Sequence, residues 1–181
     1  MRARGSDGAA ARSPALAGAD DVPAGRPGAR QRPATMAAMK DASLAYGVST
    51  LVLCLNMTVL WVMSGAVRGK TKTTPNTEDA RTVAKGSTVA EETPEAVSRV
   101  LRAHTNTVVN GVPFLLAAQV YVAAGASAEM AWAFCGGFAA IRVLYSFFYL
   151  GGVQPWRTLS FALGLLITLA MMVHTVILML G

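Results

Sequence analysis

Long stretches without charge constrain this chain more than any other feature of its sequence. Four of them occur in order along the chain, at residues 46–67, 105–128, 130–150 and 158–181. Apart from Arg142 in the third, none contains Asp, Glu, Lys or Arg. A helix needs about 20 predominantly apolar residues to cross the hydrocarbon core of a bilayer. The sequence therefore predicts an all-α fold, a bundle of four transmembrane helices.

The composition agrees with a membrane protein. Of the 181 residues, 53% are hydrophobic and 14% are charged, against about 25% charged in an ordinary soluble domain. These values exclude a disordered chain and argue against a soluble one. The formal charge of +6 comes from a polar tail and one loop. We therefore expect anionic lipid headgroups as the partner of the basic residues, and no nucleic acid.

Two of the predicted connections are short and one is long. Because residues 125–127 and 151–155 are short turns, the helices that flank each of them are expected to be antiparallel neighbours. The long connection, residues 68–93, is polar and contains five basic residues, Arg68, Lys70, Lys72, Arg81 and Lys85. By the positive-inside rule, we expect this loop to face the cytoplasm.

The N-terminal segment, residues 1–40, is rich in Ala, Gly, Pro and Arg and is expected to be a disordered tail. Its acidic residues and prolines argue against an amphipathic targeting sequence. Its seven Lys and Arg would lie on the side opposite the basic loop, against the predicted orientation. Translation from Met36 or Met39 would remove most of this conflict, and both starts stay open. Residues 41–181 are the predicted membrane domain.

The second helix is expected to begin before the membrane. Thr93 has the character of an N-cap, Pro94 suits the first helical position, and Glu95 is an acid at the positive end of the helix dipole. A helix from Pro94 to about Ala124 is longer than the hydrocarbon core is thick. Its first turns must therefore stand in the cytoplasmic headgroup layer. Pro113 is expected to loosen or kink it.

Polar side chains on three helices are expected to converge near one membrane face. Within the second and third helices they recur every three or four residues, so each set shares one face. The members are Arg102, Asn106 and Asn110 in the second helix, Arg142, Tyr145 and Tyr149 in the third, and Arg157 at the start of the fourth. An arginine inside a membrane costs at least about 2.5 kcal/mol. Arg142 should therefore face the bundle and have a partner or an anionic ligand.

Plainer explanations exist for some of these residues. Arg102 and Arg157 lie near helix ends, where arginines often extend to the lipid headgroups. The tyrosines can equally form an aromatic belt at the membrane interface. The chain shows no Gly-rich phosphate loop, nucleophile elbow or paired carboxylates, and no histidine or cysteine spacing typical of a metal site. Ordinary hydrolase and nucleotide chemistry are unsupported, and no metal is predicted.

The string Arg102-Ala103-His104-Thr105-Asn106, followed by Pro113-Phe114, resembles the signature of the MAPEG family, the membrane-associated proteins of eicosanoid and glutathione metabolism. The resemblance covers about residues 42–181. Three further similarities lie in the family's order, namely Arg68 followed by Asn76-Thr77-Glu78-Asp79, Arg142 followed seven residues later by Tyr149, and Gln154-Pro155-Trp156-Arg157.

The resemblance implies a homotrimer that binds glutathione between neighbouring subunits near the cytoplasmic side, with a lipophilic substrate entering from the bilayer. By resemblance, Arg157 and Thr158 lie beside the glutathione sulfur as the catalytic pair. A guanidinium there favours the thiolate, which is the useful nucleophile. The residues that would hold the rest of glutathione are Arg68, Arg102, Asn106, Arg142, Tyr145 and Tyr149.

The chain departs from the family pattern at four positions. Val109 replaces a glutamate that would receive the ammonium group of glutathione, and Thr107 replaces an aspartate. Tyr145 replaces a histidine found in several relatives, and Phe161 replaces a tyrosine of a prostaglandin-forming relative. Losing one charge-assisted hydrogen bond costs about 1.5–3 kcal/mol, which weakens binding at least 10-fold.

Three functions follow from these observations. The first is a membrane-bound glutathione transferase that conjugates lipophilic electrophiles or reduces lipid hydroperoxides. The second is a non-catalytic lipid-binding or scaffold protein of the same fold that no longer depends on glutathione, as Val109 and Thr107 would allow. A transporter or pore is the weakest, because the spans contain no acidic residue for ion coupling and no internal repeat.

Overall fold

A computed structural model describes residues 31–181 of the chain. Its first helix, α1 (Gln31–Thr71), begins ten residues before the predicted membrane domain. Residues 31–40, which the sequence places in the tail, are therefore part of this helix. The sequence Met-Ala-Ala-Met-Lys at the end of that segment consists of strong helix formers, which explains the earlier start. The rest of the predicted tail, residues 1–30, lies outside the described residues.

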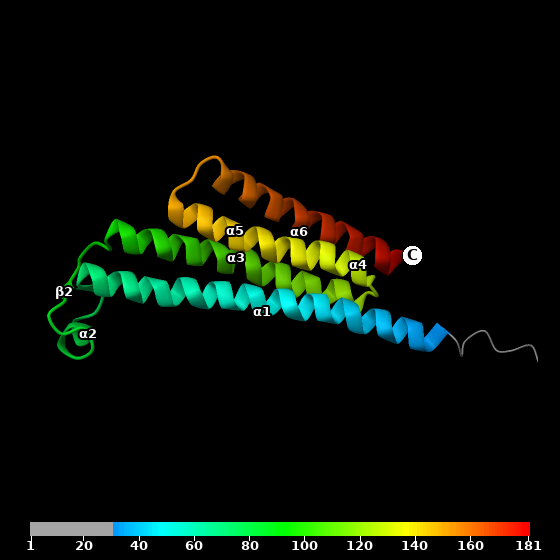
Figure 1. The fold of residues 1–181 in the computed structure, drawn as a ribbon, viewed down its shortest axis with the longest axis horizontal. Helices are drawn as coiled ribbons and strands as arrows, with labels where there is room; N and C mark the ends of the chain where they lie inside the picture. Colours follow the sequence, from blue (N-terminus) through cyan, green and yellow to red (C-terminus); the bar gives the residue numbers. More distant parts are fainter. Residues whose placement is uncertain (1–30) are drawn as a thin grey trace, which may run out of the picture.

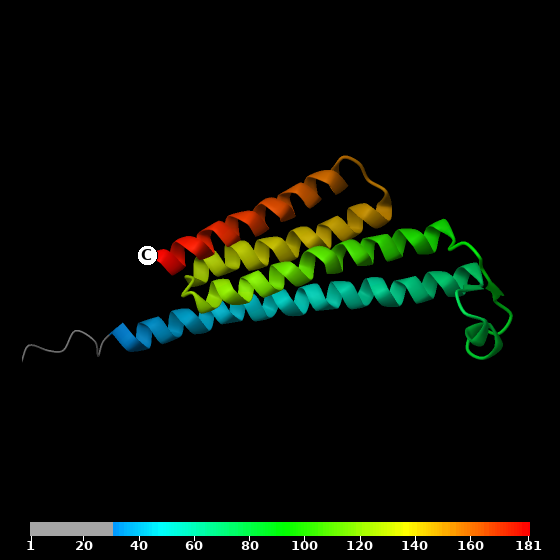
Figure 2. The ribbon, with the colours of Figure 1, turned by 180° about the vertical axis from the view of Figure 1, so that it is seen from behind.

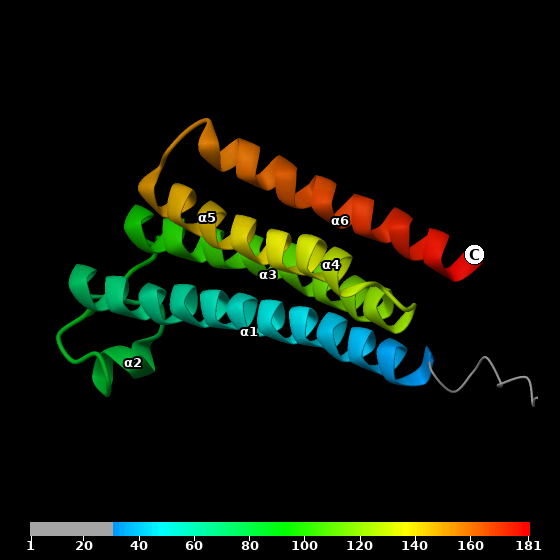
Figure 3. The same ribbon diagram turned by 45° about the vertical axis from the view of Figure 1, so that its right-hand side comes forward.

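Among the described residues, four helical segments are long and apolar enough to cross a membrane, which confirms the predicted fold. They correspond to α1, α3 (Glu95–Ala123), α4 (Ala128–Ala131) continued through the π-helical η1 (Trp132–Gly136) into α5 (Gly137–Gly151), and α6 (Trp156–Leu180). Figure 1 and Figure 3 show these segments as an antiparallel bundle in which α1 and α6 lie on opposite flanks. Arg142, in the third span, is buried inside this bundle.

The long connection after α1 has local structure of its own. Strands β1 (Thr73–Thr74) and β2 (Thr88–Val89) pair in parallel, and α2 (Thr77–Arg81) lies between them in sequence. This small unit extends beyond one end of the bundle (Figure 1). It connects the end of α1 to the start of α3, because β1 begins two residues after α1 and β2 ends six residues before α3.

One end of the bundle gathers the segments that carry the predicted site. The end of α1, the start of α3, the turn between α5 and α6 and the α2 unit all lie there, as Figure 2 shows from behind. The C-terminus and the turn after α3 lie at the other end. The segments that carry the predicted polar residues of the second, third and fourth spans therefore meet at this end of the bundle.

The core at the centre of the bundle keeps α3 and α5 in register. The rings of Phe114 and Phe138 stack with centroids 3.7 Å apart and planes 6° from parallel. Leu53 of α1 and Met171 of α6 are fully buried in the same cluster. All four spans therefore contact one core, which fixes where the polar residues meet.

One detail of α3 differs from the predictions. Its N-cap is Pro94 rather than Thr93, and the carbonyl of Thr93 instead accepts a hydrogen bond from Ser98 Oγ at 3.2 Å. Pro113 lies inside α3, which continues unbroken to Ala123. A proline removes one hydrogen bond from a helix, and in a membrane bundle neighbouring helices can compensate.

Candidate functional site

The first turns of α3 present an acidic residue between basic ones. The Glu95 carboxylate accepts a hydrogen bond from Arg102 Nη2 at 2.7 Å and lies 3.7 Å from Arg99 Nη2. Residues four and seven apart lie on the same face of a helix, and Asn106 continues this face one turn further. The start of α3 therefore carries a continuous polar edge at the end of the bundle.

Arg142 of α5 is buried in the bundle, with 1% of its surface exposed. Its Nη2 donates to the side-chain oxygen of Asn106 at 2.6 Å and to the backbone carbonyl of Asn106 at 3.0 Å. Its guanidinium also lies 4.4 Å from the centre of the Tyr145 ring. The predicted partner of this intramembrane arginine is therefore a neutral asparagine on α3, supported by an aromatic face.

Arg157, at the start of α6, lies against Tyr149 of α5. Its guanidinium carbon lies 5.0 Å from the centre of the Tyr149 ring. With its side-chain oxygen toward Arg157, the amide of Gln154 accepts from Arg157 Nε at 3.1 Å and donates to Thr158 Oγ1 at 3.1 Å. Gln154 thus connects the two residues predicted to lie beside the sulfur of glutathione.

These side chains line two adjoining pockets. The end pocket, of about 230 Å³, is lined by Glu95, Arg99, Arg102, Tyr149, Gly152 and Arg157. The inner pocket, of about 270 Å³, is lined by Asn106, Tyr145, Tyr149, Arg157, Thr158 and Phe161. Tyr149 and Arg157 belong to both, so the pockets share a wall. Three arginines face one carboxylate in the end pocket, which gives it an excess of positive charge.

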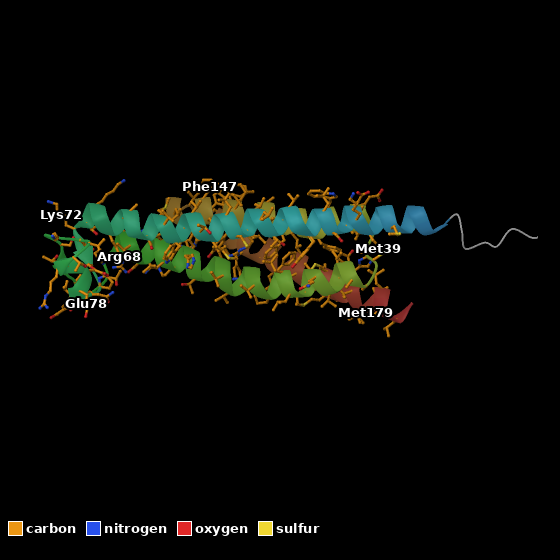
Figure 4. The ribbon with its side chains drawn as sticks, turned by 90° about the horizontal axis from the view of Figure 1, so that it is seen from below. Met39, Arg68, Lys72, Glu78, Phe147 and Met179 are labelled. Atoms are coloured by element: carbon orange, nitrogen blue, oxygen red, sulfur yellow. The ribbon has the colours of Figure 1, made fainter. Side chains whose placement is uncertain are left out.

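The structure brings together most of the residues predicted from the sequence. Six of the eight line the two pockets, namely Arg102, Asn106, Tyr145, Tyr149, Arg157 and Thr158. Arg142 lies behind this wall, in contact with Asn106 and Tyr145. Arg68 belongs to neither pocket. Figure 4 places it on α1 at the same end of the bundle as Lys72 and Glu78, away from Met39 and Met179.

Sequence reasoning missed three residues of the site. From the sequence, Glu95 is expected only to be a favourable charge at the helix start, Gln154 is only part of a motif, and Arg99 has no predicted role. A signal for the first two was present, because Glu95, Arg99 and Arg102 have the spacing of four and seven that places side chains on one helical face. No comparable spacing identifies Gln154, whose contacts depend on the turn before α6.

Gly152 closes the end pocket at the turn after α5, and we predict that it resists substitution. Its backbone is left-handed, with φ of +67°, and a Cβ there would lie 3.0 Å from Arg99 Nη1. Gly152→Ala should lower the free energy of unfolding by about 1 kcal/mol and displace Arg99. Thermal unfolding in detergent measures this change. Gly65→Ala in α1 is the control, because a Cβ there meets nothing within 4 Å; equal effects of both variants would contradict the prediction.

Comparison with known proteins decides the family. The model of the MAPEG family matches residues 46–177, which include parts of all four spans and the residues of the inner pocket. The chain belongs to the MAPEG family. Because the family is one of membrane proteins and four helices can span a bilayer, this MAPEG protein is an integral membrane protein.

Two kinds of curated relative resemble this MAPEG protein. The prostaglandin E synthase of Macaca fascicularis is 32% identical over 133 residues, covering 72% of this chain and 86% of the relative. The microsomal glutathione S-transferase 1 of Sus scrofa is 30% identical over 131 residues, covering 71% and 84%. Since the two identities are nearly equal, they do not separate a transferase from a synthase. The choice between these two activities must therefore rest on the geometry of the site.

Proposed function

We propose that this MAPEG protein is a membrane-bound glutathione transferase that conjugates lipophilic electrophiles taken from the bilayer and also reduces lipid hydroperoxides. One observation carries the proposal: two adjoining pockets share Arg157 and Tyr149 at the end of a membrane bundle. One pocket is rich in arginine, which suits the carboxylates of glutathione. The other combines hydroxyl groups with the apolar ring of Phe161, which suits a sulfur and a lipophilic partner.

The proposed chemistry needs a thiolate near Arg157. A guanidinium beside the sulfur favours the charged form, and the half-buried position of Arg157 limits screening by water. The thiolate then forms a bond to an electrophilic carbon, while the leaving group departs or the adjacent atom takes a proton. The hydroxyl of Thr158 lines the same pocket and can donate a hydrogen bond to the sulfur. The proton released from the thiol passes to water at the end of the bundle.

The lipophilic substrate would approach along α6. This helix crosses the predicted hydrocarbon region, and its residue Phe161 lines the inner pocket. Large apolar side chains of α6, Leu159 and Leu163 among them, are exposed on the bundle surface. A substrate dissolved in the bilayer can therefore reach the inner pocket without leaving apolar surroundings.

We further propose a homotrimer in which Arg68 contributes to the site of a neighbouring subunit, with the loop of residues 68–93 in the cytoplasm. Arg68 lies at the pocket end of the bundle but lines neither pocket of its own chain. An arginine predicted by resemblance to hold glutathione, yet separate from the pockets, is consistent with a site completed by a second chain. The basic loop beside it supports the cytoplasmic orientation.

Subunit complementation tests this assembly. Arg68→Ala and Arg157→Ala are each expected to be inactive alone. If every site takes one residue from each of two subunits, co-expression in equal amounts should leave about one quarter of the sites intact, from random mixing in a symmetric oligomer. Conjugation activity of the co-purified protein measures this fraction. Activity no greater than that of the two variants mixed after purification would contradict a shared site.

Purified protein tests the proposed function directly. With glutathione and a lipophilic electrophile such as a chlorodinitrobenzene, or with a lipid hydroperoxide, it should show activity that saturates with glutathione. The alternative, a non-catalytic lipid-binding protein, is favoured by Val109, which is 63% exposed and lines neither pocket. Absence of glutathione binding in the native chain, with binding restored by Val109→Glu, would establish that alternative.

A further inference from the structure

Glu95 is the feature of the site that the proposed function leaves unexplained. Among the described residues that line the two pockets, it supplies the one carboxylate. Its side chain is 65% exposed, although it is bonded to Arg102. A carboxylate in a pocket for an anionic ligand is unfavourable unless the ligand also brings positive charge.

Glutathione brings such a charge at one end. Its γ-glutamyl residue carries an ammonium and a carboxylate on the same carbon atom, and its other end carries only a carboxylate. The end pocket has the complementary arrangement, since the Glu95 carboxylate lies 2.7 Å from Arg102 and 3.7 Å from Arg99. An acid between two arginines can bind the two charges of an amino-acid group at once.

We propose that Glu95, with Arg102, recognises the α-amino-acid end of glutathione, Glu95 accepting hydrogen bonds from the ammonium and Arg102 donating to the adjacent carboxylate. This inference rests on the proposed function. It also fixes the direction of the ligand: the amino-acid end lies in the end pocket, and the thiol lies beside Arg157 toward the inner pocket. Glu95 thereby replaces the carboxylate that the chain lacks at Val109.

The same ion pair has a simpler role, in which it only ties the first turns of α3 together. An exposed pair of this kind usually contributes little to stability. The two roles differ in one respect. A structural pair has no reason to distinguish a ligand with an ammonium group from the same ligand without it.

The experiment is a calorimetric titration with two ligands, glutathione and glutaryl-cysteinylglycine, which differs from glutathione by lacking the α-amino group. The native protein should bind glutathione at least about 10-fold more tightly, as expected for one hydrogen-bonded charge. Glu95→Gln should remove this preference and bind the two ligands about equally. Glu129→Gln, an exposed acid at the other end of the bundle, is the matched control and should retain it.

The outcomes separate this inference from the proposed function. Equal binding of both ligands by the native protein, or an unchanged preference in Glu95→Gln, would overturn the role of Glu95 and leave a glutathione transferase in place. Failure of the native protein to bind glutathione at all would overturn both. Thermal unfolding of Glu95→Gln close to that of the native protein shows that any change arises in the site.

Discussion

Replacement of Arg157 by alanine is expected to lower kcat/KM for glutathione conjugation at least about 100-fold, equivalent to about 2.7 kcal/mol of transition-state stabilisation. Arg157 belongs to both pockets and is held by Gln154 and the face of Tyr149. In the proposed mechanism, its guanidinium lies beside both the thiol of glutathione and the lipophilic substrate. Without it, bound glutathione should remain a thiol, so kcat should fall more than KM rises.

Two variants make this result specific. Arg81→Ala removes an arginine of α2 that lines neither pocket, and it should leave kcat/KM within about 2-fold of the native value, as is usual for an exposed charge away from a site. Arg157→Lys retains the charge but not the planar donor group, so it should recover part of the activity. Full activity in Arg157→Ala would show that another group activates the thiol.

Replacement of Arg142 by alanine should have the largest effect on stability, lowering the free energy of unfolding by about 3 kcal/mol. The change leaves a cavity between α3 and α5 and removes the donor to the Asn106 side chain. It also releases the ring of Tyr145. Since Asn106 and Tyr145 line the inner pocket, the affinity for glutathione should fall as well. Thermal unfolding in detergent and calorimetry measure the two effects.

Arg142→Met distinguishes packing from hydrogen bonding, because it fills most of the same volume without a charge. It should recover part of the lost stability and little of the lost affinity. We expect Arg142 to act as a positioning residue, through Asn106 and Tyr145. A variant that kept native stability while losing all glutathione binding would show instead that Arg142 contacts the ligand itself.

The sequence predicts the spans and the converging polar faces because both follow from local rules. Charges are excluded from the bilayer core, and residues three or four apart share a helical face. The burial of Arg142 follows from the same rules. Its partner does not, because the contact with Asn106 depends on the register between α3 and α5, which the packing of Phe114 on Phe138 sets.

Other parts of the site lie beyond single-sequence reasoning for different reasons. The contacts of Gln154 with Arg157 and Thr158 depend on the shape of the turn before α6. The spacing of residues in the sequence does not predict that shape. In the proposed homotrimer, the role of Arg68 depends on contacts between chains, which a helical pattern within one chain does not describe. The contact between Glu95 and Arg102 could be predicted from their spacing on one helical face. The favourable charge of Glu95 at a helix start, however, already accounts for an acid at this position.

The most direct test of the account is a titration of the detergent-purified native protein with glutathione, following the ultraviolet absorbance of the thiolate together with the heat of binding. The account predicts saturable binding accompanied by a thiolate signal, and loss of that signal in Arg157→Ala. Absence of saturable binding by the native protein, or an unchanged thiolate signal in Arg157→Ala, would contradict it.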